Sequence, residues 1–404
     1  MAKQALEGVK VADFGWIQVL PTLIKYLADH GAQVVRIESS QRVDALRTAG
    51  PFKDDVPGPD RAAHFATFNN NKYGVTLNLK HPKGLEMAKG IVAWADVVAE
   101  GFTPGTMDRL GLGYEQLRVI KPDIIMLSTC SLGQTGPYAS QPGFGIQLTA
   151  FAGFSHLTGW PDREPSIPYG AYTDTIAPPL AAAALIAALD YRRRTGKGQH
   201  IDLSQYEAGI QYIAPVILDF SVNGRITNRM GNQCSYAAPH GAYPCRGQDR
   251  WCAIAVFSDE EWQSLCQAMG NPAWTKDPRF ATLQRRKENE AELDGLIGEW
   301  TRGFTAEQLM ATLQSRGVAA GVVQTCEDLY NDPQLRYRQH YQELEHPVIG
   351  KHYYESPCFK LSRTQAELRM PGPCLGQHNE YVCTQILGMS DQEFTELLAD
   401  GVFA

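Results

Sequence analysis

Short apolar runs alternate with amphipathic stretches along the first third of the chain. The apolar runs have the length of buried strands, and the stretches between them repeat apolar positions with the period of a helix. Strands are predicted at Val9–Phe14, Ala32–Ile37, Asp96–Glu100 and Ile124–Thr129, and helices at Pro21–His30 and Lys83–Trp94. This alternation predicts a doubly wound parallel sheet, so we expect a large Rossmann-like α/β domain over residues 1–222.

The pattern changes after about Asn223. A short strand is predicted at Trp251–Val256, mixed with amphipathic helices at Asp259–Met269, Glu290–Trp300 and Ala306–Arg316. These elements predict a smaller α+β domain over residues 223–326. We expect residues 327–404 to form an extended, proline-rich linker, to return to the large domain and to end in a helix near Asp391–Asp400.

Composition and charge exclude several classes of protein. With 404 residues, 44% of them hydrophobic, the chain can bury a large core. Its formal charge of -7, with no basic run longer than Arg192–Arg194, argues against nucleic acid as a partner. The first residues have no apolar signal core, and Pro178–Leu189 is too short to span a bilayer, so we expect a cytoplasmic protein with no membrane partner.

The spacing of the metal-ligating and glycine residues predicts neither a metal nor a permanently bound cofactor. The nine cysteines include no Cys-x-x-Cys pair, and the ten histidines show no His-x-x-x-His spacing. The glycines match neither a phosphate-binding loop nor a dinucleotide-binding fingerprint, because Tyr191 and Gln116 stand where glycines would be required.

Asp174 is a candidate for covalent or acid–base chemistry. The segment Pro168–Pro179 gives it aromatic neighbours, and it is the only acid between Glu164 and Asp190. A carboxylate in apolar surroundings, just ahead of a helix predicted over Leu180–Arg193, can act as a nucleophile or a base. The same position is typical of a helix N-cap, whose side chain accepts hydrogen bonds from first-turn amides. The residues alone leave both interpretations open.

Nine short motifs are spread in order over nearly the whole chain. They are Leu6–Asp13, Leu27–Glu38, Phe68–Lys72, Thr103–Glu115, Gly133–Tyr138, Arg194–Gly198, Asp277–Phe280, Gly317–Ala320 and Leu375–Gly376. In this order and spacing they resemble the class III coenzyme A transferases, a family that also contains formyl-CoA transferases, carnitine-CoA transferases and α-methylacyl-CoA racemases.

The resemblance implies a substrate class, a mechanism and a set of contact residues. The transferases of the family act on acyl-CoA thioesters and use an aspartate at the position of Asp174 as nucleophile, forming a mixed anhydride and then an aspartyl-CoA thioester. Coenzyme contacts are implied for Trp16, Ile17, Gln18, Arg36, Glu38, Asn69, Lys72, Gly101, Phe102 and Arg109. Lys72 and Arg109 suit the phosphates of the coenzyme, although a surface ion pair explains such residues equally well.

The chain departs from the family near the implied site. It has Gly101 where an asparagine is usual, Thr103 for an arginine and Gly145 for an aspartate, and we expect these changes to make room. Phe144 replaces the histidine base of the racemases, so racemisation of a 2-methylacyl-CoA is a less favoured alternative. A non-catalytic subunit of a heteromeric transferase is a third possibility, against which Asp174 argues.

The substrate pocket is expected to favour a bulky acceptor acid. Its predicted lining includes Phe144, Tyr172, Tyr236 and His240. Aromatic faces together with the glycine positions favour an aryl-substituted dicarboxylic acid such as benzylsuccinate, with succinyl-CoA as donor. Core packing is the alternative explanation for any one of these aromatic residues.

The resemblance also implies an interlocked dimer. In this family each chain is an open ring threaded by its partner, and the segment 326–373 has the length and composition of the linker that such a ring requires. Both a homodimer and a heteromer with a related subunit are compatible with the sequence.

Overall fold

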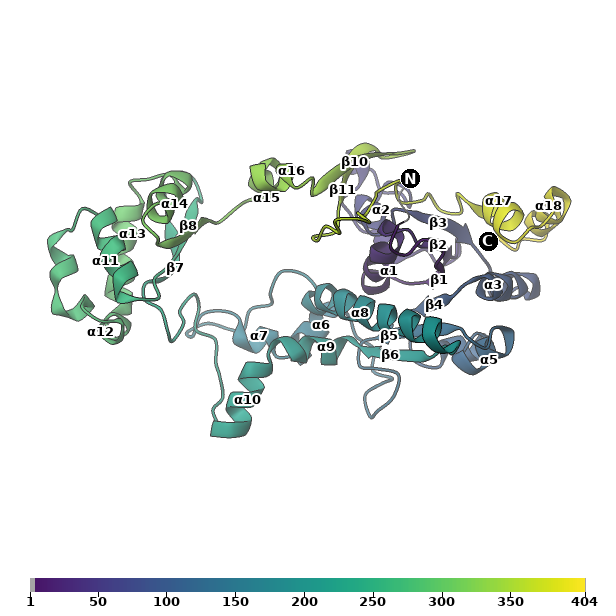
Figure 1. Cartoon of the computed structure of the whole chain (residues 1–404), viewed down its shortest axis with the longest axis horizontal. Coiled ribbons are helices and arrows are strands. Elements are labelled where there is room, and N and C mark those ends of the chain that lie inside the picture. The colour runs from purple at the N-terminus through teal and green to yellow at the C-terminus, as the bar shows by residue number, and fades with distance from the viewer. Residues whose placement is uncertain (1–3, 404) are drawn as a thin grey trace. The chain divides into compact units, whose positions relative to one another are not determined.

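The protein divides into two compact units in the structure, a computed structural model that describes residues 4–403 (Figure 1). The large unit contains the chain up to Phe154, the segment Ile167–Gly224 and the chain from Gln334 onward. The small unit contains Ser155–Ser166 and Arg225–Pro333. The domain boundaries expected from the sequence, at residues 222 and 326, stay a prediction.

A six-stranded parallel sheet forms the centre of the large unit, in the order β3-β2-β1-β4-β5-β6. The strands are β1 (Lys10–Phe14), β2 (Gln33–Glu38), β3 (Lys72–Thr76), β4 (Val97–Glu100), β5 (Ile125–Cys130) and β6 (His200–Ser204). This is the strand order of a Rossmann-like sheet. The strands stay parallel, but the direction in which successive strands are added reverses between β1 and β4. The predicted α/β class is therefore confirmed.

Helices cover both faces of this sheet (Figure 1). α1 (Val19–Asp29) and α8 (Tyr172–Thr195) pack on one face, and α3 (Pro82–Trp94) and α5 (Tyr114–Ile120) pack on the other. Successive residues of each central strand belong in turn to the two hydrophobic clusters. Because both faces are buried, the strands read as continuous apolar runs, which is why their positions could be predicted.

The remaining elements are shorter. The further helices outside the small unit's core are α2 (Ala63–Phe68), α4 (Thr106–Arg109), α6 (Gly145–Phe151), α7 (Phe154–Leu157), α9 (Gln205–Tyr212), α10 (Ala214–Asn223), α15 (Cys326–Asn331), α16 (Pro333–Tyr337), α17 (Asn379–Tyr381) and α18 (Asp391–Ala399). Single 3₁₀ turns lie at Ala45–Thr48 and Lys53–Asp55, and a π turn lies at Val382–Ile386.

Helix α8 begins at Tyr172, well before the start that the sequence predicted. It contains Pro178 and Pro179, which cannot donate backbone hydrogen bonds and usually end or kink a helix, so the pattern placed the start beyond them. By length and composition, α8 is the one helix among residues 4–403 that would suffice to cross a membrane, and 44% of its apolar window is buried. A core helix passes the same test, and α8 packs on α1 and the sheet.

The segment expected to be an extended linker contains regular structure. After α15 and α16 it forms an antiparallel hairpin of β10 (Tyr341–His346) and β11 (Gly350–Glu355). The prediction of an extended chain is therefore wrong for residues 326–355, whereas residues 356–373 form no helix or strand. The imidazole Nδ1 of His346 accepts hydrogen bonds from the backbone N–H groups of Val348 and Ile349, both at 3.1 Å, and this closes the turn of the hairpin.

The small unit has its own sheet and core. Its antiparallel strands follow the order β7-β8-β9, with β7 (His240–Pro244), β8 (Trp251–Ala255) and β9 (Ala319–Val322). Its helices are α11 (Asp259–Ala268), α12 (Leu283–Glu288), α13 (Glu290–Thr301) and α14 (Ala306–Gln314), with 3₁₀ turns at Ala273–Lys276 and Pro278–Phe280. Trp262 and Phe280 are fully buried in a hydrophobic cluster between these elements. The unit is α+β, as predicted for this part of the chain.

A buried arginine connects β2 with the C-terminal segment. Arg47 donates hydrogen bonds to both carboxylate oxygens of Glu38, at 2.9 and 2.8 Å, and to Asp60 at 3.0 Å. It also donates to the backbone oxygen of Pro373 at 3.0 Å, and its guanidinium carbon lies 3.5 Å from the ring centre of Phe65. The last part of the chain is thereby joined to the edge of the sheet at which the strands end.

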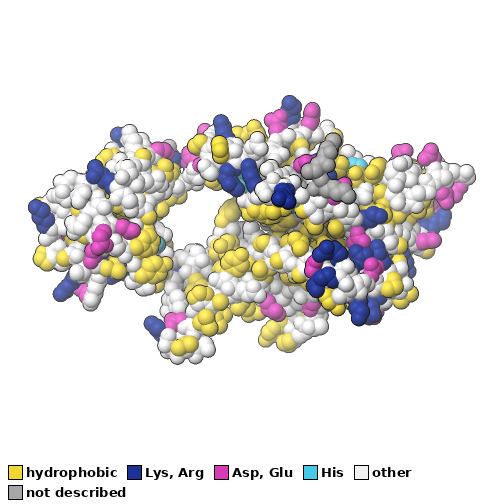
Figure 2. Space-filling view, in the orientation of Figure 1, with side chains coloured by type: hydrophobic (Ala, Val, Ile, Leu, Met, Phe, Trp, Pro, Cys, Tyr) yellow, Lys and Arg dark blue, Asp and Glu magenta, His cyan; other side chains and the backbone are white. Residues whose placement is uncertain are grey.

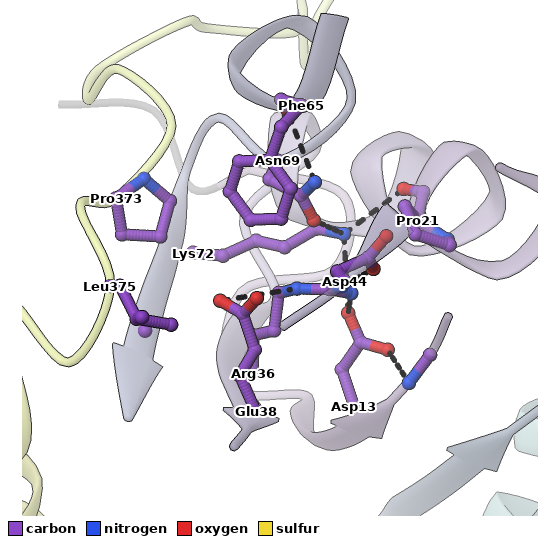
Figure 3. A network of polar contacts seen from close by, with 12 residues as sticks. Asp13, Pro21, Arg36, Glu38, Asp44, Phe65, Asn69, Lys72, Pro373 and Leu375 are labelled. Atoms are coloured by element: carbon purple, nitrogen blue, oxygen red, sulfur yellow. Dashed lines mark hydrogen bonds and ion pairs between the residues drawn. The ribbon is translucent and has the colours of Figure 1, made fainter. Parts of the chain in front are cut away.

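A second group of buried charges lies beside the first (Figure 3). Arg36 donates to Asp44 at 2.6 Å and lies 3.6 Å from Asp13, while Lys72 donates to Asp13 at 3.2 Å and to Asn69 at 3.1 Å. Burial alone would raise the pKa of Asp13, but the charges of Lys72 and Arg36 hold it below its usual value. Burial lowers the pKa of Lys72 to about 8. Lys72 begins β3, a strand that the apolar pattern missed because its first residue is charged.

Replacing Arg47 by methionine is expected to destabilise the protein by about 3–5 kcal/mol, because the buried charge of Glu38 would lose both of its hydrogen bonds from Arg47 and keep only Arg36, at 3.6 Å. Chemical unfolding measures the loss. Arg193→Met is the matched control, since Arg193 pairs with Asp190 at the surface and its side chain is 79% exposed. Little change is expected there. Equal losses in the two variants would contradict this account of the network.

Candidate active site

Two loops meet at the switch point of the sheet. Trp16–Gln18 follows β1 and Gly101–Pro104 follows β4, the neighbouring strands between which the strand order reverses. Open parallel sheets bind ligands at this place, outside the carboxyl ends of the strands. A cavity of about 170 Å³ lies here, and both loops line it together with Asp174.

Asp174 lies inside the first turn of α8. The helix begins at Tyr172, and its N-cap is Ala171, whose side chain makes no capping bond. The N-cap interpretation of Asp174 is therefore wrong. Asp174 is 9% exposed, and burial raises its pKa from 3.8 to about 6. Near neutral pH the carboxylate is ionised but poorly hydrated, which suits a nucleophile.

The lining of the cavity combines apolar and polar residues and carries no cation among the described residues. Among the described residues its polar members besides Asp174 are Gln18, Thr103, Thr129, Cys130, Ser131, Gln141 and Gln205, with no lysine or arginine. The hydroxyl of Thr129 is buried and has no hydrogen-bond partner. Burial raises the pKa of the Cys130 thiol to about 11, so this thiol is neutral near pH 7. The cavity therefore offers neutral donors around a single charged group.

The sequence did not single out the residues at the end of β5 or Gln205. Thr129, Cys130 and Ser131 lie at the carboxyl end of that strand, on the same edge of the sheet as the two loops. The end of the strand predicted at Ile124–Thr129 could have indicated these three residues, because the carboxyl ends of parallel strands lie at one common edge of the sheet.

Gly145 and Gly101 border the cavity and differ in the space beside them. A Cβ atom on Gly145 would overlap the Cβ atom of Ala171 and lie 2.7 Å from Oδ1 of Asp174. A Cβ atom on Gly101 would lie 3.2 Å from Cδ1 of Leu20. The expectation that the missing side chain makes room is therefore wrong for Gly145, where Ala171 and Asp174 already fill the space. For Gly101 and Thr103 it stays a prediction. Gly145 instead allows the carboxylate of Asp174 to approach the first turn of α6 closely.

Ile17, in the first loop, has a strained backbone. Its φ angle is 62°, in the left-handed region, which a β-branched residue adopts only when the surroundings enforce it. Such a conformation costs on the order of 1–2 kcal/mol. The backbone N–H of Ile17 donates to Oδ2 of Asp44 at 3.1 Å. The strained residue Ile17 therefore lies in the wall of the same cavity that Asp174 lines.

A second cavity of about 460 Å³ shares residues with the first. Of the expected coenzyme contacts it is lined by Trp16, Phe102, Arg36 and Glu38, and it is also lined by Arg42 and Lys80, which the sequence did not single out. Trp16 and Phe102 line both cavities. The guanidinium of Arg42 lies 5.2 Å from the ring centre of Trp16. Exposed cations at such a cavity suit a phosphate group.

Three of the expected coenzyme contacts line neither cavity. Asn69 and Lys72 are fully buried and bonded to each other, so Lys72 does not form the surface ion pair considered above. Arg109 is exposed at the end of α4 and donates to the hydroxyl of Thr106 at 2.8 Å. Contact of these three side chains with a coenzyme stays a prediction.

The expected substrate-pocket residues belong to both units. Phe144 lines the Asp174 cavity with 68% of its surface exposed, and Tyr172 is 40% exposed. Tyr236 and His240 lie in the small unit, where Tyr236 stacks on Phe257 with ring centres 6.3 Å apart. A common pocket for the four residues stays a prediction.

Comparisons with known proteins identify the family. The model of CoA-transferase family III matches residues 6–379. The chain is 34% identical to a succinyl-CoA–D-citramalate CoA-transferase of Chloroflexus aurantiacus over 98% of both chains. It is 29% identical to the beta subunit of a succinyl-CoA–L-malate CoA-transferase from the same organism, over 97% of this chain and 96% of that one. The crystal structure of a CAIB/BAIF family protein from Brucella suis matches 95% of this chain and 100% of its own, at 31% identity and a TM-score of 0.87.

The chain therefore belongs to CoA-transferase family III. It is a CoA-transferase, and CoA thioesters are its substrates. The resemblance read from the nine motifs is confirmed.

Replacing Asp174 by asparagine is expected to raise the free energy of unfolding near neutral pH. Because folding raises this pKa from 3.8 to about 6, the ionised group costs stability above both values, by roughly 3 kcal/mol at most. The cost falls as the pH falls through about 6, so the gain from the asparagine should shrink near pH 5. Urea unfolding at both pH values tests this, and a variant less stable than the wild type at neutral pH would show that Asp174 is not a strained charge.

Proposed function

We propose that this enzyme moves CoA from succinyl-CoA to a small aliphatic dicarboxylic acid through covalent intermediates on Asp174. The observation that carries the proposal is one poorly hydrated carboxylate at the switch-point cavity, with no cation among the lining residues to hold it in an ion pair. Two of the relatives described above are named for succinyl-CoA with D-citramalate or L-malate, which supports the same donor and an acceptor of that size.

The exchange proceeds by displacements at acyl carbons. The carboxylate of Asp174 attacks the thioester carbon of succinyl-CoA, the C–S bond breaks, and CoA leaves as a thiolate, giving a mixed anhydride. The thiolate attacks the Asp174 carbonyl and releases succinate, which leaves an aspartyl-CoA thioester. The acceptor carboxylate then displaces the thiolate from this thioester, and the thiolate attacks the acceptor acyl carbon and frees Asp174.

Neutral donors stabilise the tetrahedral intermediates in this scheme. Each displacement places negative charge on an oxygen next to Asp174, and preorganised hydrogen-bond donors are effective at such positions. Among the described residues the hydroxyl of Thr129 has no hydrogen-bond partner, and Thr129 is one of the residues that line the same cavity. We therefore assign the stabilisation of this oxygen to Thr129. Ser131 and Gln205 are further donors in the lining.

The coenzyme is proposed to extend across both cavities. Its thioester end would lie beside Asp174, between Gln18, Gly101 and the Ile17 backbone, and its phosphates would lie toward Arg42 and Lys80 in the second cavity. Trp16 and Phe102 would contact it in both places. Arg36 and Glu38 would shape the second cavity through their ion pairs rather than as free charges.

An aryl-substituted acceptor is less favoured than the sequence suggested. Benzylsuccinate was expected from the glycine positions and the aromatic side chains, but the space beside Gly145 is already filled. Phe144 is the one aromatic residue of the predicted pocket that lines the Asp174 cavity. A small aliphatic acid therefore accounts better for the geometry.

The alternative activities have less support. A racemase needs a second proton-transfer group, and among the described residues the titratable groups that line the cavity are Asp174 and the neutral thiol of Cys130. A non-catalytic subunit would have no need to keep a buried carboxylate charged. Both alternatives predict no transfer by the isolated chain.

We further propose that the chain works as a dimer, with itself or with a related subunit, in the cytoplasm. The dimer is supported by α10, in which no residue is buried although Ile217, Leu218, Phe220 and Val222 are apolar and 45–77% exposed. Figure 2 shows hydrophobic side chains on the surface over this helix. An apolar helix of this kind is typical of a surface that a protein partner covers.

Assays of the isolated chain with succinyl-CoA test the substrate proposal. We expect kcat/KM to be at least about tenfold higher for citramalate, malate or glutarate than for benzylsuccinate, because about 1.4 kcal/mol of lost fit corresponds to tenfold. Asp174→Asn is the control and should lower kcat by several orders of magnitude. A preference for benzylsuccinate, or for formate and oxalate, would refute the proposed acceptor class.

A further inference from the structure

The strained residue Ile17 needs an interaction that holds it. Its φ angle of 62° is one that glycine adopts freely and a β-branched residue does not. The strain has to be offset by contacts of this residue with its surroundings. The side chain of Ile17 is half-buried and packs against the cluster that contains Leu46 and Phe65, and the backbone of Ile17 makes a further contact.

Asp44 supplies the backbone contact. Its Oδ2 atom accepts the N–H of Ile17 at 3.1 Å and the guanidinium of Arg36 at 2.6 Å. Its other oxygen accepts the N–H of Leu46 at 2.9 Å and so caps the 3₁₀ turn Ala45–Thr48. Asp44 is 1% exposed, and Arg36 is fully buried. The two oxygens thus have separate partners, one in the cavity loop and one in the turn.

The tethered loop forms a wall between the two cavities. Ile17 and Trp16 line the cavity of Asp174, and Trp16 also lines the larger cavity, which Asp44 itself borders. A change in the backbone at Ile17 would move Trp16. It would therefore change how a ligand that extends through both cavities meets Asp174.

We propose that Asp44 is a positioning residue for CoA transfer: its carboxylate holds Ile17 in the left-handed conformation and so fixes the loop that aligns the thioester with Asp174. This inference rests on the proposed function. Asp44 lines no part of the Asp174 cavity and acts through the backbone of Ile17. A misplacement of about 1 Å at a reacting centre can lower a rate about a hundredfold, so the tether acts chiefly on kcat.

A double-mutant cycle between Asp44→Asn and Ile17→Gly tests the proposal. In the wild-type background Asp44→Asn should lower kcat at least about tenfold. In the Ile17→Gly background it should lower kcat less than about threefold, because glycine adopts the conformation without the tether. If Asp44→Asn lowers kcat by the same factor in both backgrounds, the proposal is overturned, since a role in the turn or in pairing Arg36 does not depend on residue 17.

Asp60→Asn is the matched control. Asp60 belongs to the same group of charges through Arg47, but it borders neither cavity. Its replacement should lower the unfolding temperature and leave kcat unchanged. If it lowers kcat as much as Asp44→Asn does, the effect belongs to the network as a whole and the proposal fails. Asp44→Asn protein that does not fold in either background would also overturn it.

Amide hydrogen exchange separates this inference from the proposed function. Without any substrate, Asp44→Asn should increase exchange in peptides that cover residues 15–18 and leave those over β5 unchanged. If the wild type transfers no CoA but this increase is seen, the tether stands and the proposed function fails. If exchange over residues 15–18 does not change, the tether is absent whatever the activity.

Discussion

Two buried arginines make it possible for acidic side chains to gather where the parallel strands end. Arg47 binds both oxygens of Glu38, and Arg36 binds Asp44 beside Asp13. Without these cations the carboxylates would be buried and unpaired, which costs several kcal/mol each. The same side chains hold the surrounding chain, since Arg47 bonds to Pro373 and Asp44 bonds to Ile17. The loops at the switch point therefore depend on this network for their position.

The surroundings of Asp174 shift its pKa in the opposite direction from that of Asp13. Lys72 and Arg36 lower the pKa of Asp13, whereas burial alone raises that of Asp174 to about 6. Two aspartates in one unit thus differ in protonation behaviour because one has cations beside it and the other does not. The paired carboxylate of Asp13 has a structural role, whereas the unpaired carboxylate of Asp174 is available to react.

The sequence predicted the strands and the site residue that depend on neighbouring residues in the sequence. β1, β2, β4 and β5 were predicted because both faces of the sheet are buried, and Asp174 was singled out because no other acid lies near it in sequence. β3 was missed because the charge of Lys72 is neutralised by Asp13, which lies 59 residues away. The start of α8 was missed because its first turn precedes two prolines that normally exclude a helix.

The remaining part of the site depends on contacts that no local pattern records. Ile17 was named through the family resemblance alone, and its strain depends on Asp44, 27 residues further along the chain. Gly145 was expected to open the cavity, but the side chains of Ala171 and Asp174 occupy the space that a larger residue would need. A glycine in the sequence shows that a side chain is missing, but it does not show whether the space that the side chain would occupy is empty.

The claim that Asp174 is the covalent nucleophile is tested most directly by trapping its acyl form. The wild-type enzyme is mixed with succinyl-CoA, quenched and treated with hydroxylamine, and its peptides are analysed by mass spectrometry. The account predicts a hydroxamate on Asp174 that requires succinyl-CoA. Continued CoA transfer with an unmodified Asp174 peptide, or a hydroxamate on another residue, would contradict it.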